Sequence, residues 1–262
     1  IRDGDVDIAG HLRGVDVEDD LLLEIVERGI LSQFLDRLGT ESEVSLQDRV
    51  NAARRGDDDL QPFPEQEAEV ALFAAAKDDS TPCLAALADL INEKDTVFMV
   101  QRHPIVLPDK LAAEKVVAGV QMVKRRPVEA RKIKEQIERL TTGDIPAMLE
   151  LTELTKPGPF LKRTFEMGEY WGVKIDGRLA AMAGERLKVP GFTEVSGVCT
   201  HPDFRGKGLA AALSTFMAGR ISDRGETPFL HAYADNDVAI EIYKRLGFEL
   251  RCEMQVGVVT RR

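Results

Sequence analysis

Apolar residues along this chain alternate between the spacing of amphipathic helices and short runs typical of strands. In residues 18–38, seven apolar side chains recur at steps of three and four, which predicts an amphipathic helix. Its apolar side would pack in a core or against a second copy of the chain, so a homodimer is one expectation. Residues 56–64 hold three aspartates and two prolines, a composition typical of a surface loop.

The middle of the chain predicts a small α/β unit. Short apolar runs at residues 70–75, 96–100 and 116–123 predict buried strands, and residues 81–92 predict a helix. The next eleven residues are rich in basic side chains and predict an exposed connection: Lys124, Arg125, Arg126, Arg131, Lys132 and Lys134. We therefore expect an N-terminal α/β unit of residues 1–123, a basic connection of residues 124–134, and a second domain of residues 135–262.

The second domain has a distinctive order of elements. Asp176 and Gly177 predict a tight hairpin, because these residues tolerate positive φ angles. Thr142 is the expected N-cap of one helix and Asn236 of another, since their side-chain oxygens can accept from free backbone donors. The predicted strands are 136–140, 170–175, 178–187, 194–200, 228–234 and 248–259, and the predicted helices begin at Thr142, Leu209 and Asn236. The order is β-α-(α)-β-β-β-α-β-α-β.

A glycine-rich turn between a predicted strand and a predicted helix carries the clearest chemistry. It reads Arg205-Gly206-Lys207-Gly208-Leu209-Ala210. Glycines let backbone N–H groups approach phosphate oxygens closely, and a helix N-terminus favours negative charge. The spacing fits neither a Walker loop nor a Rossmann fingerprint. The turn therefore predicts a pyrophosphate site of another kind.

Two motifs in this domain resemble those of the GNAT acyltransferases. Arg205-x-x-Gly208-x-Ala210 resembles the pyrophosphate loop of that superfamily, and Asn236-x-x-Ala239-x-x-x-Tyr243-x-x-x-Gly247-Phe248 is similar to its second signature. The resemblance covers residues 136–259 and looks closest to a glycine N-acyltransferase-like branch with a C-terminal GNAT domain. It implies an α/β (α+β) fold, in which helices cover both faces of a mixed, mostly antiparallel sheet.

The resemblance also implies how acetyl-CoA would bind. Backbone groups of Val198 and Thr200 would pair with the acyl and pantetheine amides, a form of β-strand addition. Arg205 and Lys207 would supply cations near the pyrophosphate, although Lys207 is equally well explained as solvated. The expected cofactor contacts are Val198, Thr200, Arg205, Gly206, Lys207, Gly208, Leu209, Ala210, Ala211, Asn236 and Tyr243. No metal is expected.

Direct attack of an amine on a thioester needs a base, a polarised carbonyl and a proton for the leaving thiolate. Tyr243 matches the proton donor of the family; the alternative is a ring that packs the last helix onto the sheet. Glu194 matches the catalytic glutamate of the histone-acetylating branch, and its apolar neighbours suggest a raised pKa. Alternatively it orients substrate or pairs with a strand neighbour. Glu185 and His231 are competing bases.

Strand alternation assigns the remaining side chains near this site. Glu194 is expected to share a face with Ser196 and Val198, and Cys199 to point to the opposite face as core packing. Cys83, Cys199 and Cys252 are three in number and not closely spaced, which argues against a zinc site or a disulfide framework. Reduced, cytoplasmic thiols are the expectation.

Composition excludes some partners and favours others. The net charge of −10 argues against nucleic acid and favours a cationic substrate. The longest apolar runs are much shorter than the roughly 20 residues that span a bilayer. The chain begins at Ile1 rather than methionine, so the sequence looks trimmed, and cytoplasm is the default location.

The combined prediction is an N-acyltransferase that moves an acetyl group directly from acetyl-CoA to a primary amine of a small molecule, amino acid or peptide. The alternatives are a catalytically silent acyl-CoA-binding or interaction protein and a transferase for a longer acyl chain. The sequence does not identify the acceptor. We expect residues 1–123 to shape or cover the acceptor side.

Overall fold

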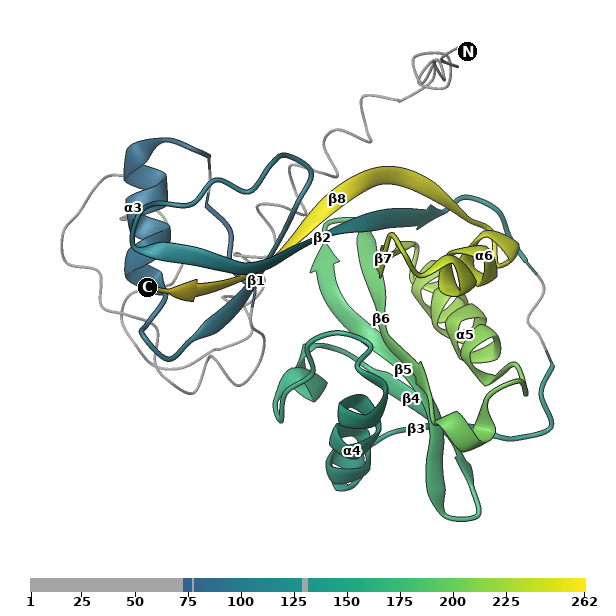
Figure 1. Ribbon diagram of the computed structural model, residues 1–262. Coiled ribbons are helices and arrows are strands. Elements are labelled where there is room, and N and C mark those ends of the chain that lie inside the picture. Colours follow the sequence, from purple (N-terminus) through teal and green to yellow (C-terminus); the bar gives the residue numbers. More distant parts are fainter. Residues whose placement is uncertain (1–72, 77, 129–131) are drawn as a thin grey trace, which may run out of the picture.

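The fold is built on one mixed sheet, seen in a computed structural model that describes residues 73–76, 78–128 and 132–262. The sheet has eight strands in the order β1-β8-β2-β7-β6-β5-β4-β3 (Figure 1). Their bounds are β1 Thr96–Gln101, β2 Leu111–Lys124, β3 Ile137–Arg139, β4 Tyr170–Ile175, β5 Arg178–Val189, β6 Phe192–Thr200, β7 Thr227–Tyr233 and β8 Phe248–Arg261. The predicted mixed α/β fold, with mostly antiparallel strand pairs, is confirmed.

Helices cover both faces of this sheet, as predicted. On one face lies α4 (Ile145–Thr155), and on the other lie α5 (Leu209–Asp223) and α6 (Asp237–Arg245) (Figure 1). A separate apolar cluster joins α3 (Thr81–Leu90) to the far ends of β1, β2 and β8. Short 3-10 helices fill three connections: η2 Thr142–Asp144, η3 Thr164–Met167 and η4 Pro202–Phe204.

The two core layers follow from the alternation of side chains on the strands. Between the sheet and α5 lies the larger cluster, which includes Leu213, Met217 and Phe248. Between the sheet and α4 lies a smaller one, which includes Met148, Tyr170 and Met182. The central strands are thus buried on both faces, which explains the unbroken apolar run at the start of β5.

Strand β2 occupies an unexpected place. It pairs antiparallel with β8 from Leu111 to Lys124 and with β7 from Gly119 to Val123. β1 pairs with the outer side of β8. Two strands from residues 1–123 therefore belong to the same sheet as the strands of residues 135–262. The division into two domains stays a prediction, and its boundary coincides with the end of β2.

Two local predictions are wrong. Thr142 is not an N-cap: Asp144 is the N-cap of α4, and Thr141 is the N-cap of the preceding η2. Thr141 and Asp144 form a capping box, in which the Thr141 backbone N–H donates to Asp144 Oδ2 at 2.8 Å. Lys124 is not part of an exposed connection, because it ends β2 and donates to the carbonyl of Leu246 at 2.7 Å. Burial, followed by the charge of Arg126, lowers the pKa of Lys124.

Other local predictions are confirmed. The hairpin between β4 and β5 turns at Asp176 and Gly177, whose φ angles are 51° and 76°. Asn236 caps α6, since its Oδ1 accepts from the Ala239 N–H at 3.1 Å. The predicted helix of residues 18–38 and the loop of residues 56–64 lie outside the described residues. Across the described ranges, no helix is both long and apolar enough to cross a membrane.

Candidate active site

The sheet opens between β6 and β7. These parallel strands pair at three positions, the last of which joins Glu194 to Phe229. From Val195 onward, β6 continues in the described pairings with β5 alone. Its backbone groups on the β7 side are therefore available to another extended chain, which is the arrangement that the sequence resemblance implied for Val198 and Thr200.

A bulge at Gly197 shapes this opening. Gly197 has φ 61°, and the three residue steps of β6 from Ser196 to Cys199 lie opposite only two residue steps of β5. The extra residue turns Val198 towards the cluster against α5, which it shares with Val195. The expectation that Glu194 and Val198 share a face is therefore wrong, because that expectation assumed unbroken alternation.

Cys199 packs in the core, as predicted. Its side chain is buried in the cluster against α4, on the opposite face from Val198. Burial raises the pKa of the Cys199 thiol to about 12. At neutral pH it is therefore a protonated thiol and a poor nucleophile.

The glycine-rich turn leads directly from β6 into α5. Gly206 and Gly208 have φ angles of 78° and 80°, which a side chain would disfavour. Gly208 is the N-cap of α5 and has no side chain, so the first N–H groups of the helix receive no side-chain cap. The Lys207 ammonium lies 5.1 Å from the centroid of the Phe204 ring. Arg205 is exposed beside it.

Glu194 is held by three neighbours in the base of the opening. Arg186 donates to both of its carboxylate oxygens, from Nε at 3.0 Å and from Nη2 at 2.9 Å. The Leu187 backbone N–H and His231 Nδ1 also lie within hydrogen-bond distance, at 3.3 and 2.9 Å. Burial alone would raise the pKa of Glu194, but the charge of Arg186 and the contact with His231 outweigh it and lower the pKa to about 2. The expectation of a raised pKa is wrong.

His231 is fixed in one tautomer by a chain of contacts across the sheet. Arg251, which can only donate, bonds to the Oε1 of Gln121. The Gln121 amide nitrogen therefore donates to His231 Nε2, at 2.9 Å. His231 Nε2 is thus an acceptor, and its Nδ1–H donates to Glu194. In this arrangement both nitrogens of the imidazole are engaged.

Glu185, the other candidate base, has a different surrounding. It is fully buried and pairs with Lys188 at 2.6 Å and with Arg224 at 2.8 Å. It does not contribute to the described lining of the cavity beside His231. These contacts are those of an ion pair that joins β5 to the end of α5.

Tyr243 lies on α6 and packs against the apolar cluster that Val195 and Val198 of β6 also join. Burial raises the pKa of its hydroxyl to about 12, with a smaller contribution from the Cys199 thiol on β6. Its ring packs against Phe248, with 6.0 Å between the ring centroids. Among the described residues its hydroxyl has no hydrogen-bond partner. The ring of Tyr243 can therefore pack α6 onto the sheet while its hydroxyl serves as a proton donor.

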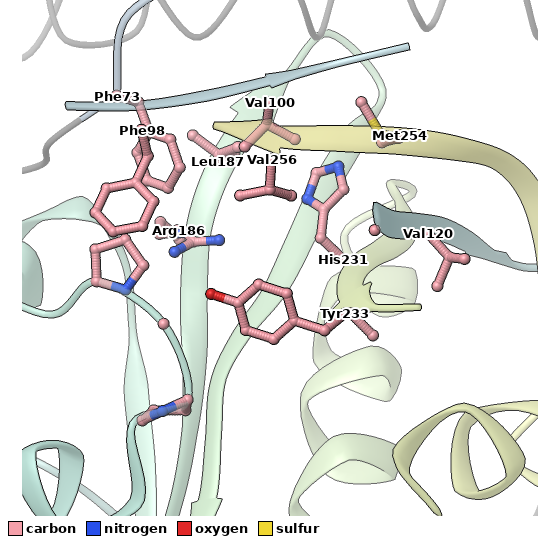
Figure 2. A pocket seen from close by; sticks show the side chains of 15 residues that line it. Phe73, Phe98, Val100, Val120, Arg186, Leu187, His231, Tyr233, Met254 and Val256 are labelled. Carbon is pink, nitrogen blue, oxygen red and sulfur yellow. The ribbon is translucent and has the colours of Figure 1, made fainter. Parts of the chain in front are cut away.

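A cavity of about 80 Å³ lies beside the Arg186–Glu194–His231 group, between β1, β7, β8 and the loop of residues 157–159 (Figure 2). Phe98 and Val100 of β1 line it, so part of residues 1–123 faces this cavity. A role of residues 1–123 on the acceptor side stays a prediction. The tyrosine ring of Tyr233 points towards Arg186 in Figure 2. A second, smaller cavity shares Arg186 and the 157–159 loop and is lined also by Ser196 and Gly197.

Sequence reasoning missed Arg186, Gln121 and Tyr233. The available signal was a charged or amide side chain inside an otherwise apolar strand, which requires a buried partner. The identity of that partner depends on strand pairing and could not be read from the local pattern. Within the described ranges, no three His, Cys, Asp or Glu side chains gather as metal ligands would.

Comparison with known proteins agrees with this geometry. A family model described as FR47-like protein matches residues 171–256. A solved structure of a GNAT-family acetyltransferase from Novosphingobium aromaticivorans DSM 12444 is 38% identical, covers 75% of this chain and 86% of its own, and has a TM-score of 0.69.

A mycothiol acetyltransferase of Corynebacterium aurimucosum is 40% identical over 62 residues, which are 23% of this chain and 20% of that protein. The match thus spans about a fifth of that relative's length. These matches leave the narrower resemblance to a glycine N-acyltransferase-like branch a prediction. The identity and coverage of the Novosphingobium structure, together with the opened sheet and the glycine-rich turn, show that the chain belongs to the GNAT family of acetyltransferases.

Proposed function

We propose that this chain acetylates a primary amine with acetyl-CoA bound in the opening between β6 and β7. The observation that carries the proposal is the end of β6–β7 pairing at Glu194, directly before the Gly197 bulge and the glycine-rich turn. Members of the GNAT family use acetyl-CoA as cosubstrate. The reaction joins the amine nitrogen to the acetyl carbon, breaks the C–S bond, and moves one proton from the amine to the thiolate in net terms.

Three features of the opening fit an acyl-CoA. The free side of β6 offers backbone groups of Val198 and Thr200 to the amides of the pantetheine arm. Thr200 Oγ1 is buried and has no hydrogen-bond partner among the described residues, as a ligand-facing hydroxyl would be. The uncapped N-terminus of α5, at Leu209 to Ala211, supplies N–H groups for the pyrophosphate, with Arg205 nearby.

Tyr243 is the proposed proton donor to the leaving thiolate. A hydroxyl with a pKa of about 12 remains protonated at neutral pH and so has a proton to give. From α6, Tyr243 packs against the apolar cluster that also holds Val195 and Val198 of β6, which brings it beside that strand. The Asn236 cap fixes the start of the same helix and thereby helps to position Tyr243.

Glu194 has a positioning role in this proposal. A carboxylate with a pKa of about 2 holds a proton too weakly to act as an efficient base near neutral pH. Instead its two oxygens orient Arg186 and His231 at the edge of the cavity. This corresponds to the alternative in which Glu194 orients substrate or pairs with a strand neighbour.

Free-thiol release from acetyl-CoA, measured with a panel of amines, tests the function. Tyr243→Phe should reduce kcat by about 100-fold or more and leave the Kd of acetyl-CoA nearly unchanged, because the hydroxyl acts on the leaving group. Protection against thermal unfolding by acetyl-CoA and longer acyl-CoAs would rank the acyl donors. Acetyl-CoA binding without turnover of any amine would contradict the proposal and favour a silent acyl-CoA-binding protein.

A further inference from the structure

The walls of the larger cavity differ sharply in character. Phe98, Val100 and Val256 are apolar parts of its lining, and Arg186, His231 and Tyr233 are the polar parts (Figure 2). The described lining contains a guanidinium but no Asp or Glu. A cavity without a carboxylate has no partner for an ammonium group. The cationic substrate suggested by the overall charge is therefore not what this cavity would select.

Arg186 presents one edge of its guanidinium without a partner among the described residues. Its Nε and Nη2 donate to Glu194 along one side of the planar group. Nη1 and the second hydrogen of Nη2 remain, which is the end-on edge that binds a carboxylate with two parallel hydrogen bonds. Nη1 lies beside Gly158, 3.9 Å from where a Cβ on that residue would be. The Phe73 ring covers the guanidinium at 4.7 Å.

Neither His231 nor Glu194 can replace Arg186 in recognising an acceptor. Both nitrogens of His231 are engaged, by Glu194 and by Gln121. Both oxygens of Glu194 are engaged by Arg186, and the side chain is 1% exposed. The free donors at the polar side of the cavity are thus the outer edge of Arg186 and, in the described part of the chain, the Tyr233 hydroxyl.

Arg186 also links the cavity to the place where the acetyl group would lie. It lines both the larger cavity and the smaller one beside Ser196 and Gly197. A carboxylate on Arg186 would leave an amine on the adjacent carbon facing the smaller cavity, which that bulge also lines. An amino acid with both groups on one carbon fits all three places. Its carboxylate binds Arg186, its amine faces the smaller cavity, and its side chain enters the larger cavity.

We propose that the acceptor is an α-amino acid with a small aliphatic side chain, whose carboxylate binds the outer edge of Arg186 and whose side chain packs against Phe98 and Val256. The inference rests on the proposed function and specifies its acceptor. The size of the cavity selects the side chain: about 80 Å³ is well below the roughly 150 Å³ of an apolar cavity that holds benzene. Valine and leucine therefore fit better than phenylalanine, while glycine leaves the apolar wall uncovered.

Thiol release from acetyl-CoA, compared between matched acceptors, tests this inference. The full chain is assayed with leucine, valine, phenylalanine, glycine and 3-methylbutylamine, which is leucine without its carboxylate. Loss of a charged hydrogen-bonding partner predicts a kcat/KM for 3-methylbutylamine roughly 10- to 100-fold below that for leucine. Glycine and phenylalanine should also fall below leucine. Equal kcat/KM for leucine and 3-methylbutylamine would overturn the inference.

Arg186→Lys tests the named residue. Lysine keeps a cation beside Glu194 but lacks the second, end-on pair of donors. The ratio of kcat/KM for leucine over 3-methylbutylamine should fall towards one. Arg220→Lys is the matched control, because Arg220 also pairs with a carboxylate and lies over an aromatic ring, at Glu169 and Trp171 outside the cavity. That variant should keep the native ratio, and an unchanged ratio in Arg186→Lys would contradict the assignment.

The outcomes distinguish a wrong acceptor class from a failure of the proposed function. If acetyl-CoA protects the protein against unfolding and amines other than these amino acids are acetylated, the function stands and the acceptor class is wrong. The acceptor class is also wrong if acetyl-CoA protects but none of the amino acids is acetylated. If acetyl-CoA neither protects nor releases thiol, the proposed function itself fails. Should Arg186→Lys not fold, the comparison of leucine with 3-methylbutylamine still decides the question.

Discussion

A full negative charge at Glu194 persists in a place almost without solvent, which is unfavourable unless neighbours offset the lost hydration. Arg186, the Leu187 N–H and His231 together provide that offset. The carboxylate then holds the guanidinium in turn, so that one edge of Arg186 faces Glu194 and the other remains for a ligand. The charge of Glu194 therefore serves to orient the Arg186 guanidinium.

Glu194→Gln tests this arrangement through stability. The variant keeps the shape of the side chain but leaves the Arg186 charge buried without an anion, so the free energy of unfolding at pH 7 should fall by about 3–5 kcal/mol. The pKa of Glu194 is lowered from 4.5 to about 2 by folding. Its ionised form therefore stabilises the protein above pH 4.5, and this contribution is lost as pH falls towards 2.

Urea unfolding curves of the native protein and the variant should consequently converge as the pH is lowered below 4.5. Glu241→Gln is the control: Glu241 pairs with Lys244 on the exposed side of α6, and its replacement should cause no measurable change at either pH. A difference between native and Glu194→Gln proteins that stays constant with pH would show that the carboxylate is not ionised in the fold.

Strands β5 and β6 owe their functional shape to two irregularities. One is the Gly197 bulge, and the other is a register shift between Glu185 and Lys188 that lies opposite Glu194. The order of elements was predictable, because apolar periodicity and turn residues act locally. An isolated glycine inside a strand pattern signals a bulge, but the effect of Gly197 on Val198, and the pairing of Arg186 with Glu194, depend on a neighbouring strand.

Gly197→Ala should separate the role of the bulge from its backbone strain. A side chain at this positive φ costs about 1–2 kcal/mol, and the added Cβ would meet Tyr170 Cε1 at 3.3 Å. Gly177→Ala is a matched control, since Gly177 has φ +76° and nothing within 4 Å of an added Cβ. Both variants should lose similar stability in urea unfolding, whereas Gly197→Ala alone should raise the KM for acetyl-CoA. An unchanged KM would show that the bulge does not contact the donor.

The whole sheet depends on a strand that precedes the family motifs. Neither the length nor the apolar run of β2 indicates its partners. Those partners lie more than 100 residues later in the chain, and the local pattern carries no information about them. The hydrogen bond from Lys124 to Leu246 joins residues 122 positions apart. The sequence thus located β2 as a buried strand but could not place it between β7 and β8.

Met122→Ala measures how far β2 belongs to the main core. Met122 is fully buried in the cluster against α5, so its truncation should cost about 2–5 kcal/mol in urea unfolding. Val116→Ala, on the same strand at a side chain that is 48% exposed, should change stability by no more than about 0.5 kcal/mol. A single unfolding transition is expected for both. Two transitions, with Met122→Ala affecting one of them alone, would support separate domains.

The position of β2 has a consequence for synthesis on the ribosome. β2 ends at Lys124, whereas its neighbours β7 and β8 begin at Thr227 and Phe248. At about 5–20 residues per second, synthesis from Lys124 to Phe248 (248 − 124 = 124 positions) takes roughly 6–25 s. During that interval both edges of β2 lack the strands with which they pair in the folded protein. We expect the nascent chain to recruit holding chaperones at this stage and to become protease-resistant only after β8 has emerged.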